Sequence, residues 1–266
     1  NAFAAQVDLV REAESISLTA IVADKGIPRG LNALLAEGGR VRRFGFLQAE
    51  LDRAKKDMLR GMEQAYAERE KTNSNVYAES YVSSFLESEP STSIGYDLDA
   101  VKQFLPTITL AEVNKLAGEW MTDKNRVLAT TSPEKPGIVN PTRGELLLAF
   151  DAVKGADIAA YTENAQSKQL VENEPAVGKV VSEREIKDIG VTEWKLSNGV
   201  RVLLKPTDFN ADQITFSAYS PGGASLLPDA GYQAASAADL IPMTSGIGKF
   251  NAVDLQKYLA GKQVSV

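Results

Sequence analysis

Apolar and polar residues alternate along residues 15–23, in the segment SISLTAIVA. A period of two residues is typical of a strand with one buried face, so we predict a strand here. Leucines at helical spacing follow Pro28. They predict a helix that begins near this proline and ends at the Gly38-Gly39 pair.

A helical period replaces the strand period further along the chain. From Gln48 to about Glu70 the apolar residues form one stripe among many charged residues, which predicts an amphipathic helix. A further helix is predicted over residues 74–88, just before a proline. Thr109 and Glu112 have the spacing of a capping box, in which each side chain binds the other residue's backbone N–H, and they predict another helix.

Residues 1–140 are therefore predicted to form one α+β domain. The segment NRVLATT, at 125–131, predicts the strand that closes it. Strand, helices and strand in this order favour a mainly antiparallel sheet with helices packed on one face.

Residues 141–190 are predicted to be a helical and acidic linker. Thr142 and Glu145 form a second capping box, which predicts a short helix. The chain then turns polar and acidic, with few large apolar residues, from about 162 to 190. Such a composition is typical of a connection between domains.

Residues 191–266 are predicted to begin a second domain of the same α+β class. Two alternating segments flank Asn198-Gly199, which is a strong hairpin signal. A third strand is predicted at 213–220, followed by a glycine-rich turn and an alanine-rich helix. The sequence stops where a helix passes into a strand, so we expect this second domain to be truncated.

Composition narrows the chemistry that the chain can perform. Hydrophobic residues make up 44% of the 266 residues and charged residues 24%, and the net charge of −6 argues against nucleic acid as a partner. No apolar run approaches the length of a membrane span. The sequence contains no Cys and no His, which excludes disulfides, thiolate nucleophiles, the Ser-His-Asp triad and nearly every catalytic zinc site.

Two glycine-rich stretches have competing interpretations. GIGKF, at 246–250, resembles part of a phosphate loop, but Met243 replaces its first glycine and Phe250 its Ser or Thr. We favour a helix end and turn. Gly222 and Gly223 are consistent with an anion-binding nest or with a sharp turn after a strand, and we favour the turn.

The remaining candidates are charged clusters. Carboxylate pairs can perform acid–base catalysis, and grouped arginines can hold an acidic partner. The clusters are Glu87 with Glu89, Asp97 with Asp99, and Arg40 with Arg42 and Arg43. A solvated surface explains all of them equally well, and we favour that interpretation.

The segment TEWKLSNGVRVLLKPTDFNADQITFSAYSPGGASLLPD, which begins at Thr192, resembles the pitrilysin/insulinase-like (M16 family) zinc peptidases. DLQKYLAGK, at 254–262, continues this likeness. Upstream, GFLQAELDRAKKDML and LPTITLAEVNKLAGEWM resemble the second domain of the family's first half. The resemblance implies two homologous halves joined by a helical linker, with this chain spanning the end of the first half, the linker and the start of the second.

In the family's active half, the glycine-rich turn leads into a helix that bears H-x-x-E-H. Its histidines bind zinc and its glutamate is the general base. Counted from the turn, the His, Glu and His positions fall at Ser236, Asp239 and Leu240. None of these residues matches the motif, so the resemblance implies a degenerate, non-catalytic counterpart. We therefore assign no catalytic, metal-binding or substrate-binding residue in this chain.

The resemblance implies a middle portion of a bacterial zinc metalloendopeptidase that hydrolyses peptides or unfolded proteins. The catalytic half and its zinc are expected upstream, and this chain alone is expected to be inactive, as part of the chamber wall and the hinge. One alternative is a non-catalytic scaffold or partner subunit of the same family, and another is an unrelated carboxylate hydrolase. The bacterial members that this chain resembles are exported, so the resemblance favours a periplasmic or secreted protein over a cytoplasmic one. The resemblance is also compatible with a homo-oligomer.

Overall fold

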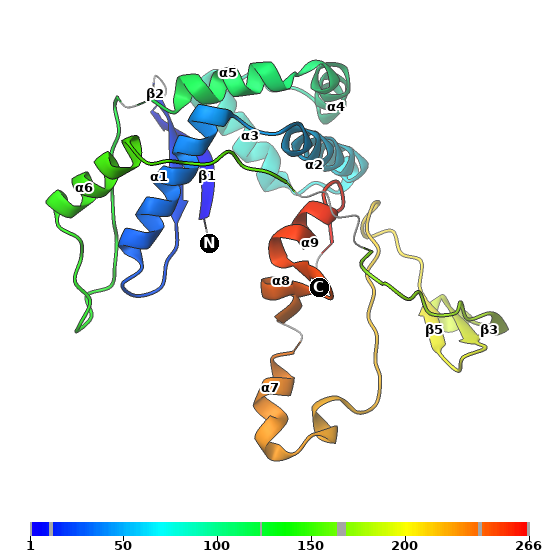
Figure 1. The fold of residues 1–266 in the computed structure, drawn as a ribbon. Helices are drawn as coiled ribbons and strands as arrows, with labels where there is room; N and C mark the ends of the chain where they lie inside the picture. Colours follow the sequence, from blue (N-terminus) through cyan, green and yellow to red (C-terminus); the bar gives the residue numbers. More distant parts are fainter. Residues whose placement is uncertain (1, 11–12, 123, 164–168, 239–240, 265–266) are drawn as a thin grey trace. The chain divides into compact units, whose positions relative to one another are not determined.

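The computed structural model (Figure 1) describes residues 2–10, 13–122, 124–163, 169–238 and 241–264. The chain divides into two compact units. Unit 1 comprises Asn1–Lys55, Ala78–Ser91 and Lys102–Ala165, and unit 2 comprises Lys56–Tyr77, Thr92–Val101 and Gln166–Val266. Each unit combines helices with antiparallel strands, so the predicted α+β class is confirmed.

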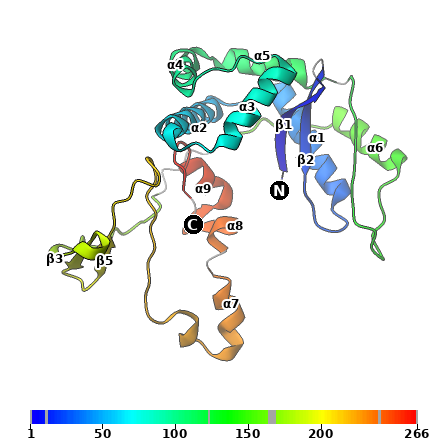
Figure 2. The ribbon, with the colours of Figure 1, turned by 180° about the vertical axis from the view of Figure 1, so that it is seen from behind.

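Unit 1 begins with a hairpin of two antiparallel strands, β1 (Ala2–Val10) and β2 (Ala13–Ala20). The predicted strand at 15–23 corresponds to β2, which starts earlier and ends at Ala20. No strand was predicted at β1. Figure 2 shows this hairpin beside helix α1, which contacts β2.

Helix α1 (Ile27–Phe44) has Pro28 in its first turn, as predicted. The predicted end at Gly38-Gly39 is wrong, because the helix continues to Phe44 and stops before Gly45, whose φ is 71°. Neighbouring side chains come close to both glycines. A Cβ on Gly38 would lie 3.2 Å from a methyl carbon of Leu18, and glycine therefore permits close packing at this point rather than ending the helix.

Helices α5 (Leu110–Trp120) and α6 (Arg143–Lys154) both pack against α1. Each begins with the predicted capping box, and both boxes are complete, with Thr109 and Thr142 as the N-cap residues. The buried apolar residues of unit 1 include one from each of four segments: Leu51, Leu105, Ala117 and Ile158.

Three helices contribute residues to both units: α2 (Gln48–Ala67), α3 (Ser74–Glu87) and α4 (Ile94–Phe104). Short 3-10 helices follow α2 and α4, namely η1 (Arg69–Lys71) and η2 (Leu105–Thr107). The predicted helices at 48–70 and 74–88 are confirmed to within a few residues.

The predicted strand at 125–131 is wrong. The described part of this segment has no regular structure, Asn125 has a φ of 55°, and the side chain of Val127 is 90% exposed. No described strand pairs with it, and a strand without a partner leaves its backbone groups to water.

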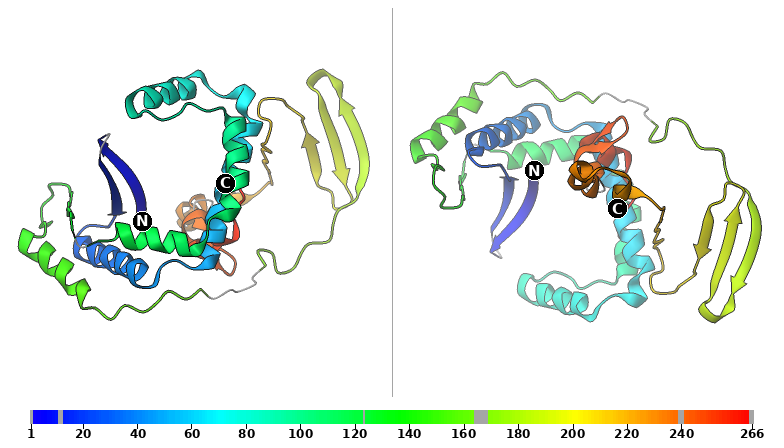
Figure 3. Two further views of the ribbon diagram at one scale, coloured as in Figure 1. Left: turned by 90° about the horizontal axis from the view of Figure 1, so that it is seen from above. Right: turned by 90° about the horizontal axis from the view of Figure 1, so that it is seen from below.

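Unit 2 contains a three-stranded antiparallel sheet of β3 (Val180–Ile186), β4 (Val191–Leu196) and β5 (Arg201–Leu204), with β4 in the centre. Figure 3 shows these strands side by side in yellow-green. The predicted hairpin is confirmed, and Gly199 in its turn has a φ of 87°. β3 lies inside the predicted linker of residues 141–190, so this part of the segment is a strand of the sheet rather than an irregular connection.

Beyond β5 the chain forms short elements. The predicted strand at 213–220 is wrong: the segment is irregular, and Ile214, Phe216 and Tyr219 are 96%, 86% and 93% exposed. The following elements are η4 (Gly223–Leu226), η5 (Asp229–Gly231), α7 (Tyr232–Ser236), α8 (Ile241–Ser245), β6 (Gly246–Ile247), β7 (Phe250–Asn251) and α9 (Ala252–Tyr258). Over the described ranges, none of the helices has both the length and the apolar character needed to cross a bilayer.

Candidate functional site

Gly222 and Gly223 make the turn that opens the candidate segment. Their φ angles are 121° and 66°, in the region that favours glycine. A Cβ on Gly222 would lie 2.9 Å from Cδ1 of Leu226, and the hydroxyl of Ser225 donates to the Gly222 carbonyl at 2.8 Å. Backbone geometry therefore accounts for both glycines, which supports the turn interpretation.

Ser236 is the one described residue among the three counted for the zinc motif. It is the last residue of α7, it is exposed, and its hydroxyl donates to the backbone carbonyl of Tyr232 at 2.6 Å. Asp239 and Leu240 lie outside the described residues. In place of one long alanine-rich helix, the structure shows the short helices α7 and α8 on either side of this position.

The side chains of this chain do not fit the zinc site of active family members. Zinc in such sites is bound chiefly by His, Cys and carboxylates, and the sequence has neither His nor Cys. In the part of the chain that the structure describes, no group of three or more potential ligands lies close enough to hold a metal ion. We therefore assign no zinc ligand here.

The GIGKF stretch forms the tight hairpin between β6 and β7, directly after the end of α8. Gly246 has a φ of 108°, and a Cβ there would lie 2.0 Å from the carbonyl oxygen of Phe250. The ammonium group of Lys249 forms an ion pair with Glu172. The structure thus shows the helix end and turn that we favoured.

The loop after β5 is attached to α2 and η1 within unit 2. Nη1 of Arg60 lies 2.5 Å from Oδ2 of Asp212, and the backbone N–H of Asp212 donates to Glu68 at 2.8 Å. Lys71 donates to the carbonyl of Asp208. The hydrogen bond and charge of Arg60 hold the pKa of the Asp212 carboxyl below its usual range, and the pKa of Arg60 is raised in turn.

Other described carboxyl groups are also stabilised in their charged form. Arg184 donates to Glu193, and Arg201 pairs with the same carboxylate, so the pKa of Glu193 is lowered. The capping-box hydrogen bonds lower the pKa values of Glu112 and Glu145. A general acid at neutral pH needs a raised pKa instead, so these four carboxyl groups are not suited to that role.

The arginine cluster at 40–43 contacts backbone carbonyls. Nε of Arg40 donates to the carbonyl of Ala159 at 3.0 Å, and Nη1 of Arg43 donates to the carbonyl of Ala156 at 2.7 Å. In the carboxylate pairs, the side chains of Glu87, Glu89 and Asp99 are exposed, and Asp97 accepts a hydrogen bond from Thr92 at 2.5 Å. The solvated-surface interpretation agrees with the exposed carboxylates, but not with Arg40 and Arg43, whose side chains bind the chain itself.

The sequence reading missed two ion pairs, Arg53 with Glu163 and Arg60 with Asp212. Their partners are separated by 110 and 152 residues. The local pattern of apolar and polar residues cannot predict a contact between residues so far apart in the sequence. The opposite charges of the partners were the only hint of these pairs in the sequence.

Comparison with known proteins gives two curated relatives, although no family model matches. The chain is 29% identical over 227 residues to "Zinc protease PQQL-like" of Arabidopsis thaliana and 22% identical over 228 residues to "Probable zinc protease PqqL" of Haemophilus influenzae. The alignments cover 85% and 86% of this chain but 24% of each relative. The chain thus spans about a quarter of the length of these relatives.

Two solved structures share the fold. The periplasmic protease PqqL from Escherichia coli matches with a TM-score of 0.51 at 18% identity, over 97% of this chain and 29% of that one. A mutant of the ferredoxin protease FusC, in complex with Arabidopsis ferredoxin, matches with a TM-score of 0.54 at 16% identity over the same shares. Together with the curated relatives, these matches confirm the predicted resemblance.

Proposed function

We propose that this chain, a homologue of the pitrilysin-like (M16 family) zinc proteases, is a non-catalytic portion of a zinc-dependent metalloendopeptidase. One observation carries the proposal: 85% of the chain aligns with a zinc protease, yet the sequence has no His and no Cys. The active-site zinc and the general base would then belong to another part of the same peptidase.

The role that we propose for this chain is structural. Residues 1–140 would form the second domain of the first half, 141–190 the linker, and 191–266 the beginning of the inactive second half. The Arg60–Asp212 pair joins two segments of the chain itself, which is consistent with a structural role. Closure of the two halves around a substrate would exclude water from the site.

The substrate that we propose is a peptide or an unfolded protein. One structural neighbour is a ferredoxin protease in complex with ferredoxin, which supports a protein substrate. Another neighbour is a periplasmic protease, and we propose the periplasm as the location of this protein also.

Zinc analysis combined with a cleavage assay tests the proposal. The purified chain is incubated with zinc and desalted, its bound zinc is measured by elemental analysis, and a quenched fluorescent peptide reports hydrolysis. We expect zinc below a tenth of an equivalent, no cleavage, and an unfolding midpoint that EDTA leaves unchanged. Activity that appears only when a separately expressed H-x-x-E-H half is added would support the assignment. Stoichiometric zinc or chelator-sensitive cleavage by this chain alone would contradict it.

A non-catalytic scaffold of the same family is the second candidate. The absence of His and Cys from this chain is equally compatible with it. If the rest of the polypeptide and its partner chains lack H-x-x-E-H, and no added half restores cleavage, the scaffold function replaces the peptidase function.

A further inference from the structure

Helix α6 is followed by an irregular segment, residues 156–163, that contacts α1 and α2 at several successive points. The sequence predicted this segment to be part of a linker. In the structure, arginines from α1 and α2 bind it, and one of its side chains is buried. We call residues 156–163 the strap.

The first attachment is at the end of α6. Nη1 of Arg43 donates to the carbonyl of Ala156 at 2.7 Å, and Nη2 donates to the carbonyl of Lys154 at 3.1 Å. The last carbonyls of a helix lack partners within the helix, so the Arg43 guanidinium satisfies groups that would otherwise need water. A lysine has no planar fork of donors to reach both carbonyls in this way.

The second attachment is apolar. Ile158 is only 8% exposed and lies against Gly39 of α1, where an added Cβ would come within 3.0 Å of Cδ1 of Ile158. The neighbouring Arg40 donates to the carbonyl of Ala159 at 3.0 Å. The glycine that was expected to end α1 thus provides space for the strap, and the adjacent arginine holds its backbone.

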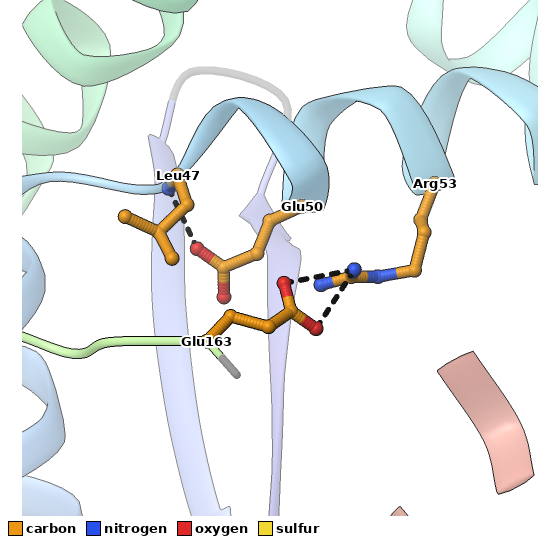
Figure 4. A network of polar contacts seen from close by, with 4 residues as sticks. All are labelled: Leu47, Glu50, Arg53 and Glu163. Atoms are coloured by element: carbon orange, nitrogen blue, oxygen red, sulfur yellow. Dashed lines mark hydrogen bonds and ion pairs between the residues drawn. The ribbon is translucent and has the colours of Figure 1, made fainter. Parts of the chain in front are cut away.

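The third attachment is the ion pair between Arg53 and Glu163 (Figure 4). Nη1 of Arg53 lies 3.0 Å from each oxygen of the Glu163 carboxylate. The two side chains are 22% and 16% exposed, so this pair is less screened by salt than a surface pair. Glu50 does not compete for Arg53, since its carboxylate accepts the backbone N–H of Leu47 at 2.7 Å.

We propose that the strap is held fixed against α1 and α2 by these three attachments, of which the Arg53–Glu163 pair is the last among the described residues. The proposal rests on the hinge role given above. It narrows that role, because residues 156–163 would then take no part in the motion between the two halves. The clamp acts chiefly on backbone carbonyls, so it does not depend on most of the strap's side chains.

Single-cysteine labelling tests the clamp, because the chain has no cysteine of its own. Ile158→Cys reports opening of the strap, and Val177→Cys, at a position that is 92% exposed, reports unhindered labelling. With a maleimide probe, we expect Ile158→Cys to react at least tenfold more slowly than Val177→Cys. Adding Arg53→Ala or Arg40→Ala should bring its rate to within a factor of about two of the exposed thiol.

Two further variants separate the clamp from general loss of structure. The charge exchange Arg53→Glu with Glu163→Arg should restore slow labelling of Ile158→Cys. Lys135→Ala, which removes an exposed ion pair with Asp24 elsewhere in unit 1, should leave the rate unchanged. Far-UV circular dichroism checks that each variant retains its helices.

Fast labelling of Ile158→Cys in the otherwise unchanged chain would overturn the proposal, as would an unchanged rate after Arg53→Ala or failure of the charge exchange. The labelling rate does not depend on zinc or on an added catalytic half. If Ile158→Cys is labelled slowly but no added half restores peptidase activity, the proposal of a fixed strap is supported and the proposed function is refuted.

Discussion

The carboxylate of Asp212 accepts a hydrogen bond of 2.5 Å from Nη1 of Arg60, while the backbone N–H of the same aspartate donates to the carboxylate of Glu68. A single residue of the loop after β5 therefore makes both a charged and a backbone contact with the chain around α2. Such a contact fixes a loop whose apolar side chains, such as Phe209, are exposed and provide little packing.

Asp212 should stabilise unit 2 above pH 4 and lose this effect in acid. Its folded-state pKa is lowered, so the stabilisation is present above the unfolded pKa of about 3.9 and is lost as pH falls through the folded value. Asp212→Asn should lower the urea midpoint at pH 7, and the difference from wild type should shrink at pH 3. Asp24→Asn, which removes an exposed pair with Lys135, is the matched control and should change neither midpoint measurably. Equal effects of Asp212→Asn at both pH values would contradict this prediction.

Loss of an N-cap should cost about 1 kcal/mol of unfolding free energy. The hydroxyl of Thr142 accepts the backbone N–H of Glu145 at 3.3 Å at the start of α6. Thr142→Ala should therefore lower the free energy of unfolding by roughly this amount, as measured by urea titration, whereas Thr142→Ser should keep most of it. If the serine variant is as unstable as the alanine variant, the hydroxyl is not the source of the effect.

Two glycines should respond to alanine in opposite directions. Gly61 lies within α2, and an added Cβ would meet nothing within 4 Å, so Gly61→Ala should stabilise by about 0.5–1 kcal/mol. Gly246 has a positive φ, and its Cβ would overlap the Phe250 carbonyl, so Gly246→Ala should destabilise unit 2. Urea titrations monitored by circular dichroism measure the change in unfolding free energy for each variant. A loss of stability in Gly61→Ala would show that α2 is packed more tightly at this position than the structure indicates.

The sequence predicted the elements whose signals are local. The capping boxes at Thr109 and Thr142 and the turn at Asn198-Gly199 depend on residues within four positions of each other, and all three are present. The α+β class and the family resemblance also followed from these short patterns and from the quoted segments.

The errors concern contacts between distant residues. β3 lacks clear alternation, and polar cross-strand pairs stabilise it, including a hydrogen bond from Trp194 to Glu183. Gly39 was taken as a helix end because its partner, Ile158, is far away in the sequence. The segment at 213–220 alternates correctly, yet no described strand pairs with it, and alternation alone does not supply a neighbour.

That same segment, QITFSAYS, has consequences for handling the protein in solution. It contains no charged residue, no proline and no glycine, and its apolar side chains at Ile214, Phe216 and Tyr219 are almost fully exposed. Short stretches of this kind are prone to stack into cross-β fibrils. Concentrated samples of this chain should therefore aggregate through residues 213–220, and a lysine in place of Thr215 would slow the aggregation.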